Sequence, residues 1–548
     1  MQEPRDRWMN RAAFTMAAIG SAVGLGNVWR FPFVTYQNGG GAFLVPYLVA
    51  LVTAGIPLMI LEYGLGQMMQ GSAAKSFAKV NRRWEWIGWW AIMAGFSITV
   101  YYAVVMAWCW GYLYRSISLA WKEGAKVFFF DRFLGLTGKP WPLGGIRWHV
   151  VLGLALTWGM IGWIVVRGVH RVGKVVMITV PLPMVLLGVF VVRGLTLPGA
   201  WEGIQYYLTP DFSKLTQPKV WLAAYSQIFF SLSLGFGILI AYASYLPKRS
   251  DVNNNAFITS FANCGTSYFA GFAVFSVLGY LAQVTNAGVE SVVAGGPGLA
   301  FITYPTAIAQ LPTWPAFFGV LFFLTLLSLG IDSAFSLVEA VVAGVRDRWP
   351  MSQSKATWMV CIPAFVLGLI FTTGAGLHWL DIVDHFLNNY GLAAVGCMEA
   401  IVIAYVFGTG RFRAYVNRHS EIKIGRWWDV FVKLVTPVVL GFSILLSLVE
   451  EIRTPYGGYP YWAVFLGGWM VAIGIVNVAV LLMDRRAFLR ISLPISAVLL
   501  FLLTKWLPAM WVMFGVTVVV LYGGLTVSLY VARKKQEVWL DVENEAME

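Results

Sequence analysis

The strongest constraint on this chain is its series of long apolar runs, separated by short loops that carry most of the charge. A helix needs about 20 consecutive apolar residues to cross the hydrocarbon core of a bilayer, where every backbone polar group must be paired. We therefore predict spans at 12–36, 42–69, 88–114, 148–166, 173–193, 218–245, 256–284, 315–345, 356–373, 378–407, 428–449 and 461–483. Two further runs, at 488–505 and 508–532, bring the predicted count to fourteen and place both termini on one side.

The composition indicates the same class of protein. Of the 548 residues, 59% are apolar and only 12% are charged, whereas soluble domains carry about 25% charged residues. The four cysteines lie inside apolar runs, so the sequence gives neither a disulfide framework nor a metal-ligand spacing. The bilayer is the expected solvent for most of the surface.

The net charge of +13 does not indicate a nucleic-acid partner, because the basic residues fall in small groups between apolar runs. Such groups follow even-numbered spans, for example at 75–83, 167–174 and 533–535. Lys and Arg are retained in cytoplasmic loops, so this pattern sets the orientation; the exception at 115–147 is a long loop, where the rule is weaker. We expect a multi-pass protein of the cell (inner) membrane with both termini in the cytoplasm.

Two predicted spans contain clusters of glycine. They are Gly20, Gly24 and Gly26 in the first span, and Gly235 and Gly237, next to Ser231 and Ser233, in the sixth. Each glycine weakens a helix by roughly 1 kcal/mol relative to alanine, so clusters let the backbone unwind. Interruptions at corresponding positions of two halves point to an inverted-repeat transporter and its binding site. The alternative is that the glycines only permit close helix packing.

Several motifs resemble the neurotransmitter:sodium symporter family. The first span contains GSAVGLGNVWRFP at 20–32, followed by NGGGAF at 38–43, and is similar to the family's first helix. QIFFSLSLGFG at 227–237 resembles its sixth helix, and NCGTS at 263–267, LGIDS at 329–333 and VDHF at 383–386 extend the likeness over about residues 5–483.

The resemblance implies an all-α LeuT-type fold with unwound helices 1 and 6. It divides the chain into a ten-helix core at 1–407, made of inverted five-helix repeats at 1–193 and 218–407, and peripheral helices at 408–483. The hairpin at 484–532 has no counterpart among the family's usual twelve helices, and 533–548 is an expected cytoplasmic tail.

The resemblance also implies two sodium sites. The first takes the carbonyl of Ala22, the side chains of Asn27, Ser231 and Asn263, and the substrate carboxylate. The second takes the carbonyls of Gly20, Val23 and Leu329 and the side chains of Asp332 and Ser333. Asp332 is informative on its own, since an ionisable residue inside a span is costly and by default functional. The alternative is a structural carboxylate paired with a polar neighbour.

A zwitterionic amino acid is the substrate that the resemblance implies. Its carboxylate is expected to meet the N–H groups of Leu25 and Gly26 and the hydroxyl of Tyr102, and its ammonium the carbonyls near Phe230 and Ser231, with Ser333. Ile98, Phe230, Phe236 and Leu337 are expected to form an apolar wall, and Ala22, Gly24 and Ser233 complete the predicted set. Monoamine-carrying relatives have an aspartate where this chain has Gly24, so a neutral amino acid is favoured.

Chloride and two gates complete the implied site. The predicted chloride ligands are Tyr47, Gln227, Ser231, Asn263 and Ser267, and the anion would balance the charge of two sodium ions in a medium of low dielectric constant. The outer gate pairs Arg30 with Asp384 above a lid of Tyr102 and Phe230. The inner gate pairs Arg5 with Asp347, supported by Trp8 and Tyr245. Glu62 and Glu339, also inside spans, are interpreted as structural carboxylates in preference to proton carriers.

The sequence therefore predicts a sodium-coupled, chloride-dependent symporter of neutral, hydrophobic L-amino acids that works by alternating access. No catalytic triad, HExxH motif or phosphate-binding loop indicates an enzyme. An ion channel or a binding protein that does not transport remains an alternative on the same scaffold. The particular amino acid, sodium stoichiometry, proton antiport, the role of the last two helices, and the choice between monomer and homodimer stay open at this stage.

Overall fold

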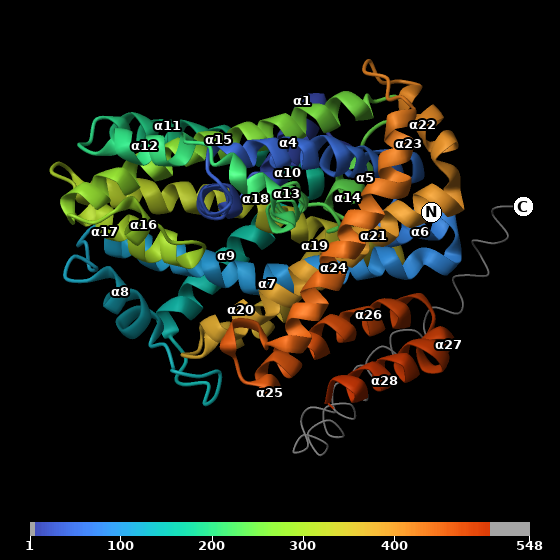
Figure 1. Ribbon diagram of the computed structural model, residues 1–548. Coiled ribbons are helices and arrows are strands. Elements are labelled where there is room, and N and C mark those ends of the chain that lie inside the picture. The colour runs from blue at the N-terminus through green and yellow to red at the C-terminus, as the bar shows by residue number, and fades with distance from the viewer. Residues whose placement is uncertain (1–5, 505–548) are drawn as a thin grey trace, which may run out of the picture.

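The computed structural model describes residues 6–504, and over that range the chain is built almost entirely of helices (Figure 1). The longest are α7 (Glu85–Ser116), α15 (Val252–Val284) and α18 (Pro315–Arg348). Helices α7 and α18 pack along each other and most of their residues are buried, so they form the centre of the molecule. The prediction of an all-helical fold is confirmed for the described residues.

The other spans consist of shorter helices that follow one another with bends. In the N-terminal half these are α1 (Arg11–Ala22), α2 (Leu25–Trp29), α3 (Phe31–Gln37), α4 (Leu44–Ala50), α5 (Ile56–Met69), α9 (Trp148–Val165), α10 (Gly168–Thr179) and α11 (Pro181–Leu195). In the C-terminal half they are α13 (Pro218–Ser231), α14 (Ile238–Ala243), α19 (Gln353–Gly368), α20 (Gly376–Phe386), α21 (Ala393–Ile401), α22 (Thr409–Asn417), α23 (Arg426–Val430), α24 (Thr436–Arg453), α25 (Tyr461–Val464) and α26 (Met470–Met483). The connections contain α6 (Ala73–Val80), α8 (Ala125–Val127), α12 (Ala200–Leu208), α16 (Val289–Val292) and α17 (Tyr304–Ala309), and α27 (Arg485–Ala487) and α28 (Leu493–Thr504) end the described chain.

The predicted count of fourteen spans is too high for the described chain. Ten helical stretches between residues 6 and 504 are long and apolar enough to cross a membrane, or eleven if the bent pair at Arg11–Ala22 and Leu25–Gln37 is one span. The sixth predicted span is missing from this count because it is divided into α13 and α14, each too short to cross alone. Only the first run of the terminal hairpin reaches into the described part, as α28, and its second run at 508–532 lies outside it.

The first span is broken where its glycine cluster predicts a break. Helix α1 ends at Ala22, and Val23 (ψ 103°) and Gly24 (φ −135°, ψ −165°) are extended. The helix resumes at Leu25 with its axis bent by 50°. The N–H of Val23 still donates to the carbonyl of Ile19, but the N–H of Gly24 has left the helical ladder inside the predicted membrane region, and another group must satisfy it.

The sixth span is broken over a longer stretch, between Ser231 at the end of α13 and Ile238 at the start of α14. Three residues in this break have left-handed backbone: Ser233 (φ +55°), Gly235 (φ +78°) and Gly237 (φ +71°). Glycine adopts this conformation without a steric penalty, whereas a residue with a Cβ rarely does. The glycines of the motif therefore allow the turn, and Ser233 is held in it by its surroundings.

A polar contact joins the last described helix to the rest of the molecule. Asn477 of α26 is buried; its Nδ2 donates to Ser496 Oγ at 2.9 Å, and its Oδ1 accepts from Ser492 at 2.6 Å and Ser496 at 3.1 Å. In a bilayer, apolar side chains gain little by leaving lipid for protein, so hydrogen bonds and close packing hold helices together. We call these three residues the C-terminal clasp.

We expect Asn477→Leu to loosen α28 from α26. Interhelical hydrogen bonds in membrane proteins contribute about 0.6 kcal/mol each, with a maximum near 1.7 kcal/mol. Protease cleavage after residue 484 in a detergent-purified sample should be several-fold faster in the variant. Ser492→Ala is the matched control, because Ser496 keeps its bonds to Asn477 and the change in rate should be smaller. Equal rates in wild type and Asn477→Leu would show that the clasp does not hold the helix.

Candidate functional site

The two breaks meet at a buried network of amide and hydroxyl groups. The Oδ1 atom of Asn27 accepts from the N–H of Gly24 at 2.9 Å, and its Nδ2 donates to Asn263 Oδ1 at 2.8 Å and Ser267 Oγ at 2.7 Å. Asn263 Nδ2 in turn donates to Ser231 Oγ at 2.8 Å. The structure thus brings together Asn27, Ser231 and Asn263, which the sequence assigned to the first sodium site. Their oxygens are the hard ligands that a small monovalent cation uses.

Asp332 lies against the first break from the side of α18. A Cβ atom added to Gly20 would be 3.1 Å from Asp332 Oδ2, so the backbone of α1 passes directly beside the carboxylate. Asp332 is 2% exposed, and its Oδ1 accepts a hydrogen bond from the hydroxyl of Thr179 at 2.6 Å. No salt bridge to Lys, Arg or His reaches Asp332 within residues 6–504. A bound cation would compensate a carboxylate at this depth.

The carbonyl oxygen of Ser21 is a shared hydrogen-bond acceptor that the sequence did not predict. Ser233 Oγ of the sixth-span break donates to it at 2.8 Å, and Ser333 Oγ of α18 lies 3.4 Å from the same oxygen. Within the described chain, no group of three or more His, Cys, Asp or Glu side chains could hold a metal ion. The chemistry of the site is therefore that of carbonyls, hydroxyls, amides and one carboxylate.

The predicted substrate residues surround Gly24 and Gly26. A Cβ atom added to Gly24 would be 2.7 Å from Ser333 Oγ and 3.5 Å from Tyr102 Oη, and one added to Gly26 would be 3.2 Å from Phe230 Cε1. Within the described residues, the Tyr102 hydroxyl is buried close to the backbone N–H of Leu25 and to Ser333, and it forms no hydrogen bond of standard geometry. The break in the first span therefore faces Tyr102, Ser333 and Phe230, and one hydroxyl is left to donate to a ligand.

The apolar wall is also assembled, on the N-terminal side of Tyr102 along α7. A Cβ atom added to Gly95 would be 3.3 Å from Leu337 Cδ2 and 3.4 Å from the carbonyl oxygen of Phe236. Ile98 lies one turn after Gly95, and Ile98, Phe236 and Leu337 are buried. Three separate elements thus supply apolar side chains to one region.

Tyr47 and Gln227 are the predicted chloride ligands whose buried polar atoms lack hydrogen bonds in the described chain. In the part of the chain that the structure describes, both polar atoms of the Gln227 amide are buried without hydrogen-bond partners, and the buried hydroxyl of Tyr47 approaches Cys264 and Ser267 without forming a hydrogen bond of standard geometry. Tyr47 lies beside Ser267, and Ser267 contacts Asn27 and Asn263. Leaving buried donors unpaired costs about 1–3 kcal/mol each. A chloride ion, which accepts hydrogen bonds from hydroxyl and amide donors, fits this set of residues.

The outer gate residues do not form a direct salt bridge. The guanidinium of Arg30 lies 4.6 Å from the centroid of the Phe230 ring, and its Nη2 is 3.5 Å from Ser226 Oγ. Asp384 accepts instead from the hydroxyl of Tyr101 at 2.7 Å and the amide of Asn388 at 2.8 Å. Arg30 and Asp384 attract each other electrostatically across the remaining gap.

The inner gate is tightly packed around Trp8. Its Nε1 donates to the carbonyl of Tyr242 at 2.8 Å, its ring meets Tyr245 edge-on, and the Tyr245 hydroxyl donates to Glu339 at 2.9 Å. Asp347 accepts from the N–H of Ser72 at 2.7 Å and is 3.7 Å from Lys75. The predicted partner of Asp347, Arg5, lies outside the described residues.

Several contacts at the site had no signal in the sequence. Thr179 lies 153 residues before Asp332 in the chain, and nothing in its local sequence marks it. The carbonyl of Ser21 is likewise invisible to an analysis of side chains. A partner for Tyr101 could have been predicted. It is adjacent to Tyr102 on one helix, so its hydroxyl points in another direction and needs a different hydrogen-bond acceptor, which is Asp384.

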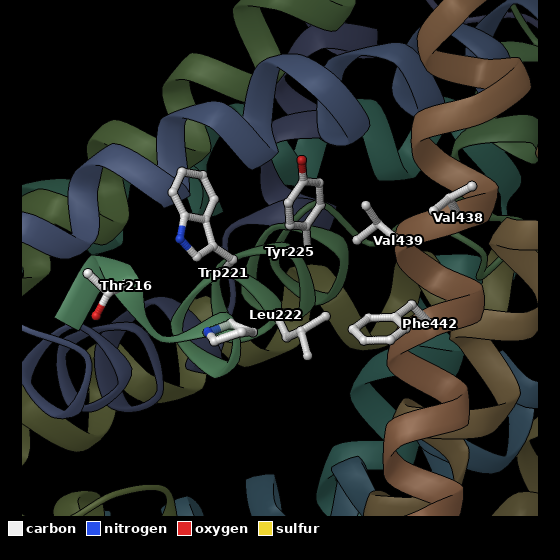
Figure 2. Close-up of a pocket in the computed structure, with 8 residues that line it drawn as sticks. Thr216, Trp221, Leu222, Tyr225, Val438, Val439 and Phe442 are labelled. Carbon is white, nitrogen blue, oxygen red and sulfur yellow. The ribbon is translucent and has the colours of Figure 1, made fainter.

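A separate pocket of about 390 Å³ lies between α13 and α24 (Figure 2). It is lined by Thr216, Pro218, Trp221, Leu222, Tyr225, Val438, Val439 and Phe442. None of these residues belongs to the predicted site, and α24 exposes apolar side chains such as Val438 and Phe442. The pocket therefore belongs to the apolar outer surface and is distinct from the region between the two breaks.

Comparison with known proteins gives consistent matches along most of the chain. The family model described as the sodium:neurotransmitter symporter family matches residues 5–132 and 122–488. An uncharacterised sodium-dependent transporter of Methanocaldococcus jannaschii is 43% identical over 483 residues, which cover 88% of this chain and 98% of the relative. A sodium- and chloride-dependent neutral and basic amino acid transporter of Homo sapiens is 34% identical, covering 87% and 85%. A sodium-dependent dopamine transporter of Caenorhabditis elegans is 34% identical, covering 83% and 82%.

We expect Asp332→Asn to abolish most stabilisation of the purified protein by sodium. The amide keeps the size of the side chain and can still accept from Thr179, but it removes the one carboxylate beside Gly20. A loss of one charge interaction should weaken apparent sodium affinity by at least about tenfold, or about 1.4 kcal/mol. Melting temperature against sodium concentration, with choline as the balancing cation, measures this. Glu339→Gln is the control, since that carboxyl is buried in the same helix away from the breaks; an unchanged sodium response in Asp332→Asn would contradict the assignment.

Proposed function

This chain belongs to the sodium:neurotransmitter symporter family, and from that premise we propose that it couples the sodium gradient to uptake of neutral, hydrophobic L-amino acids, with chloride as a further requirement. Family membership makes it a multi-pass sodium-dependent transporter with the LeuT fold, and not an enzyme. In the proposed arrangement the ten-helix core is 1–407, with repeats at 1–193 and 218–407 and peripheral helices at 408–483. The protein would lie in the cell (inner) membrane with both termini in the cytoplasm.

The observation that carries the substrate proposal is the close approach of Gly24 to Ser333 and Tyr102. The space around this glycine contains the hydroxyl groups of Ser333 and Tyr102, and the first span carries no carboxylate. An amine without its own carboxylate would lack a negative partner there. A zwitterion brings that charge itself, and its carboxylate can accept from Tyr102 and complete the ligands of a sodium ion held by Asn27 and Asn263.

The preference for an apolar side chain rests on Ile98, Phe236 and Leu337, which converge from α7, the sixth-span break and α18. Burying an apolar side chain contributes about 25 cal/mol per Å² of area removed from water. A charged side chain at the same place would lose its hydration without gaining a partner. The human relative is named for neutral and basic amino acids, and the absence of an acid from this wall is the reason to propose only neutral ones here.

Chloride is proposed from the unpaired donors of Tyr47 and Gln227 beside Ser267. One buried carboxylate, Asp332, cannot balance two sodium ions and a neutral zwitterion. An anion within a few ångströms reduces the remaining excess of positive charge in a medium of low dielectric constant. No acidic residue stands at position 267 to serve this purpose instead.

Alternating access would use the two breaks as hinges. Trp8 packs against Tyr242 and Tyr245 at the end that we propose to be cytoplasmic, whereas Arg30 and Asp384 attract each other without forming a salt bridge. This asymmetry suits a state that receives substrate from outside. Closure of Arg30 onto Asp384 would then require the Arg30 guanidinium to leave Phe230 and displace Tyr101 or Asn388.

The substrate is expected to be found by thermal stabilisation of the purified protein against the twenty amino acids. A ligand that binds only the folded state stabilises it by about 2.7 kcal/mol at one hundred times its dissociation constant. Neutral amino acids with apolar side chains should raise the melting temperature in sodium and not in choline. A monoamine in place of an amino acid is the control, and stabilisation by the amine alone would contradict the role given to Gly24.

An uptake assay with the same amino acid then distinguishes a transporter from a binding protein that does not transport and from an ion channel. Proteoliposomes with an inward sodium gradient should accumulate the amino acid above its external concentration. Binding without accumulation would favour the non-transporting alternative. Sodium current without saturable uptake would favour a channel.

Chloride dependence is expected to appear in the same assay. Replacing chloride by gluconate should lower initial uptake several-fold, because the positive charge of the loaded site is then unbalanced. Ser267→Glu supplies a fixed negative charge and should restore uptake in gluconate, while Ser267→Gln, of similar size and without charge, should not. Wild-type uptake that ignores chloride would reject this part of the proposal.

A further inference from the structure

Two carboxylates that the proposed mechanism does not use lie buried behind the sixth-span break. Glu62 belongs to α5 and Glu399 to α21, and both side chains are 0% exposed. The helices α5 and α21 pack against each other. The two residues come from spans that are far apart in the chain, so the fold is what brings them together.

Glu62 is tied to the unwound backbone. Its Oε1 atom accepts a hydrogen bond from the N–H of Gly235 at 2.8 Å, and its Oε2 atom is buried with no partner. Gly235 has left-handed backbone (φ +78°) and stands between Ser233 and Phe236, two residues of the candidate site. A change in the shape of this break therefore changes the surroundings of the Glu62 carboxyl group.

Glu399 has fewer hydrogen bonds than Glu62. Both of its carboxyl oxygens are buried, and neither has a hydrogen-bond partner among the described residues. Its electrostatic interaction is with Glu62. A buried acid that faces only another buried acid has nothing to stabilise its ionised form, apart from a proton placed between the two.

No basic group in the described chain neutralises this pair. The other group that interacts with Glu62 is Tyr63, whose hydroxyl donates to Thr259. The charged residues on elements packed against α5 and α21 have other partners or are exposed. Lys75 pairs with Asp347, Arg413 with Asp429 and Glu451 with His385, while Lys79 donates to the carbonyl of Met69, Arg115 donates to the carbonyl of Gly111, and Glu85 accepts from Trp89. Lys433, Arg411, Glu450 and Arg453 are exposed. The pair is thus isolated from compensating positive charge.

We propose that Glu62 and Glu399 share one proton and form a proton-binding site whose occupancy is linked to the conformation of the sixth-span break. Two carboxylates that interact within a protein interior, on helices packed together, cannot both be ionised without a large penalty, and one bound proton lets one acid donate to the other. The proton adds to Glu399 or Glu62 as a carboxylic acid O–H and leaves as a hydronium ion, so no other reactant is needed. The site takes a proton and not a metal ion, because two carboxyl groups without further oxygens offer too few ligands.

The link to ligand binding follows from thermodynamic reciprocity. If binding at Ser231, Ser233 and Phe236 moves Gly235, the hydrogen bond to Glu62 changes and so does the affinity of the pair for its proton. A proton must then alter ligand affinity by the same factor. This link rests on the proposed function, whereas the shared proton itself does not.

Calorimetry tests the link directly. The stabilising amino acid is titrated into sodium-loaded protein in buffers of different ionisation enthalpy, at several pH values around neutrality. A slope of observed enthalpy against buffer ionisation enthalpy gives the number of protons exchanged, and we expect up to one per amino acid bound in wild type. Glu399→Gln should reduce the slope to near zero at every pH, whereas Glu339→Gln, a buried acid with Tyr245 and Gln353 as partners, should retain it.

A second measurement needs no ligand and tests the shared proton alone. At high pH the pair would carry two repelling charges in the protein interior, so wild-type melting temperature should fall as pH rises. Glu399→Gln removes one acid and should flatten that fall, and Glu62→Gln serves if Glu399→Gln does not fold, because its amide oxygen can still accept from Gly235. Equal pH profiles in wild type and variants would overturn the proton site. If wild type releases or takes up no proton on binding the amino acid, but its melting temperature falls with pH and Glu399→Gln flattens that fall, only the link is overturned. If no amino acid stabilises the protein, that result counts against the proposed function.

Discussion

The structure depends on one constraint: at membrane depth a peptide group released from a helix must find another partner. Both breaks release such groups, and side chains from neighbouring helices satisfy them. The amide of Asn27 accepts from Gly24, the carboxyl group of Glu62 accepts from Gly235, and the hydroxyl of Ser233 donates to the carbonyl of Ser21. The breaks are therefore fixed conformations held by specific bonds. In water the same stretches would be ordinary loops, free to choose among many shapes.

Those bonds also explain why the site is assembled from so many distant parts of the chain. The long helices α15 and α18 are continuous through the region of the breaks, and they carry Asn263, Ser267, Asp332 and Ser333 on fixed positions. The broken helices bring backbone oxygens and N–H groups to them. Two continuous helices thus face two broken ones, which is the arrangement expected around a transporter's binding site.

The general fold could be read from the sequence because its signals are local. Runs of apolar residues mark spans, and the glycines at 20–26 and 235–237 mark the two breaks. The count of spans differs at the sixth run because that run is continuous in hydropathy, while its backbone forms two short helices on either side of the glycine break.

The partners across the fold were harder to predict. Thr179 and Glu399 stand in apolar runs whose own patterns say nothing of Asp332 or Glu62, and only packing brings them into contact. Arg30 and Asp384 were expected as a pair, but Phe230, Tyr101 and Asn388 compete for the same groups. The C-terminal clasp has a consequence for how such proteins diversify. Because Asn477 of α26 bonds Ser492 and Ser496 at the edge of the described molecule, a lineage could acquire or lose a terminal helix by changing a few polar positions there, while the interior kept its packing.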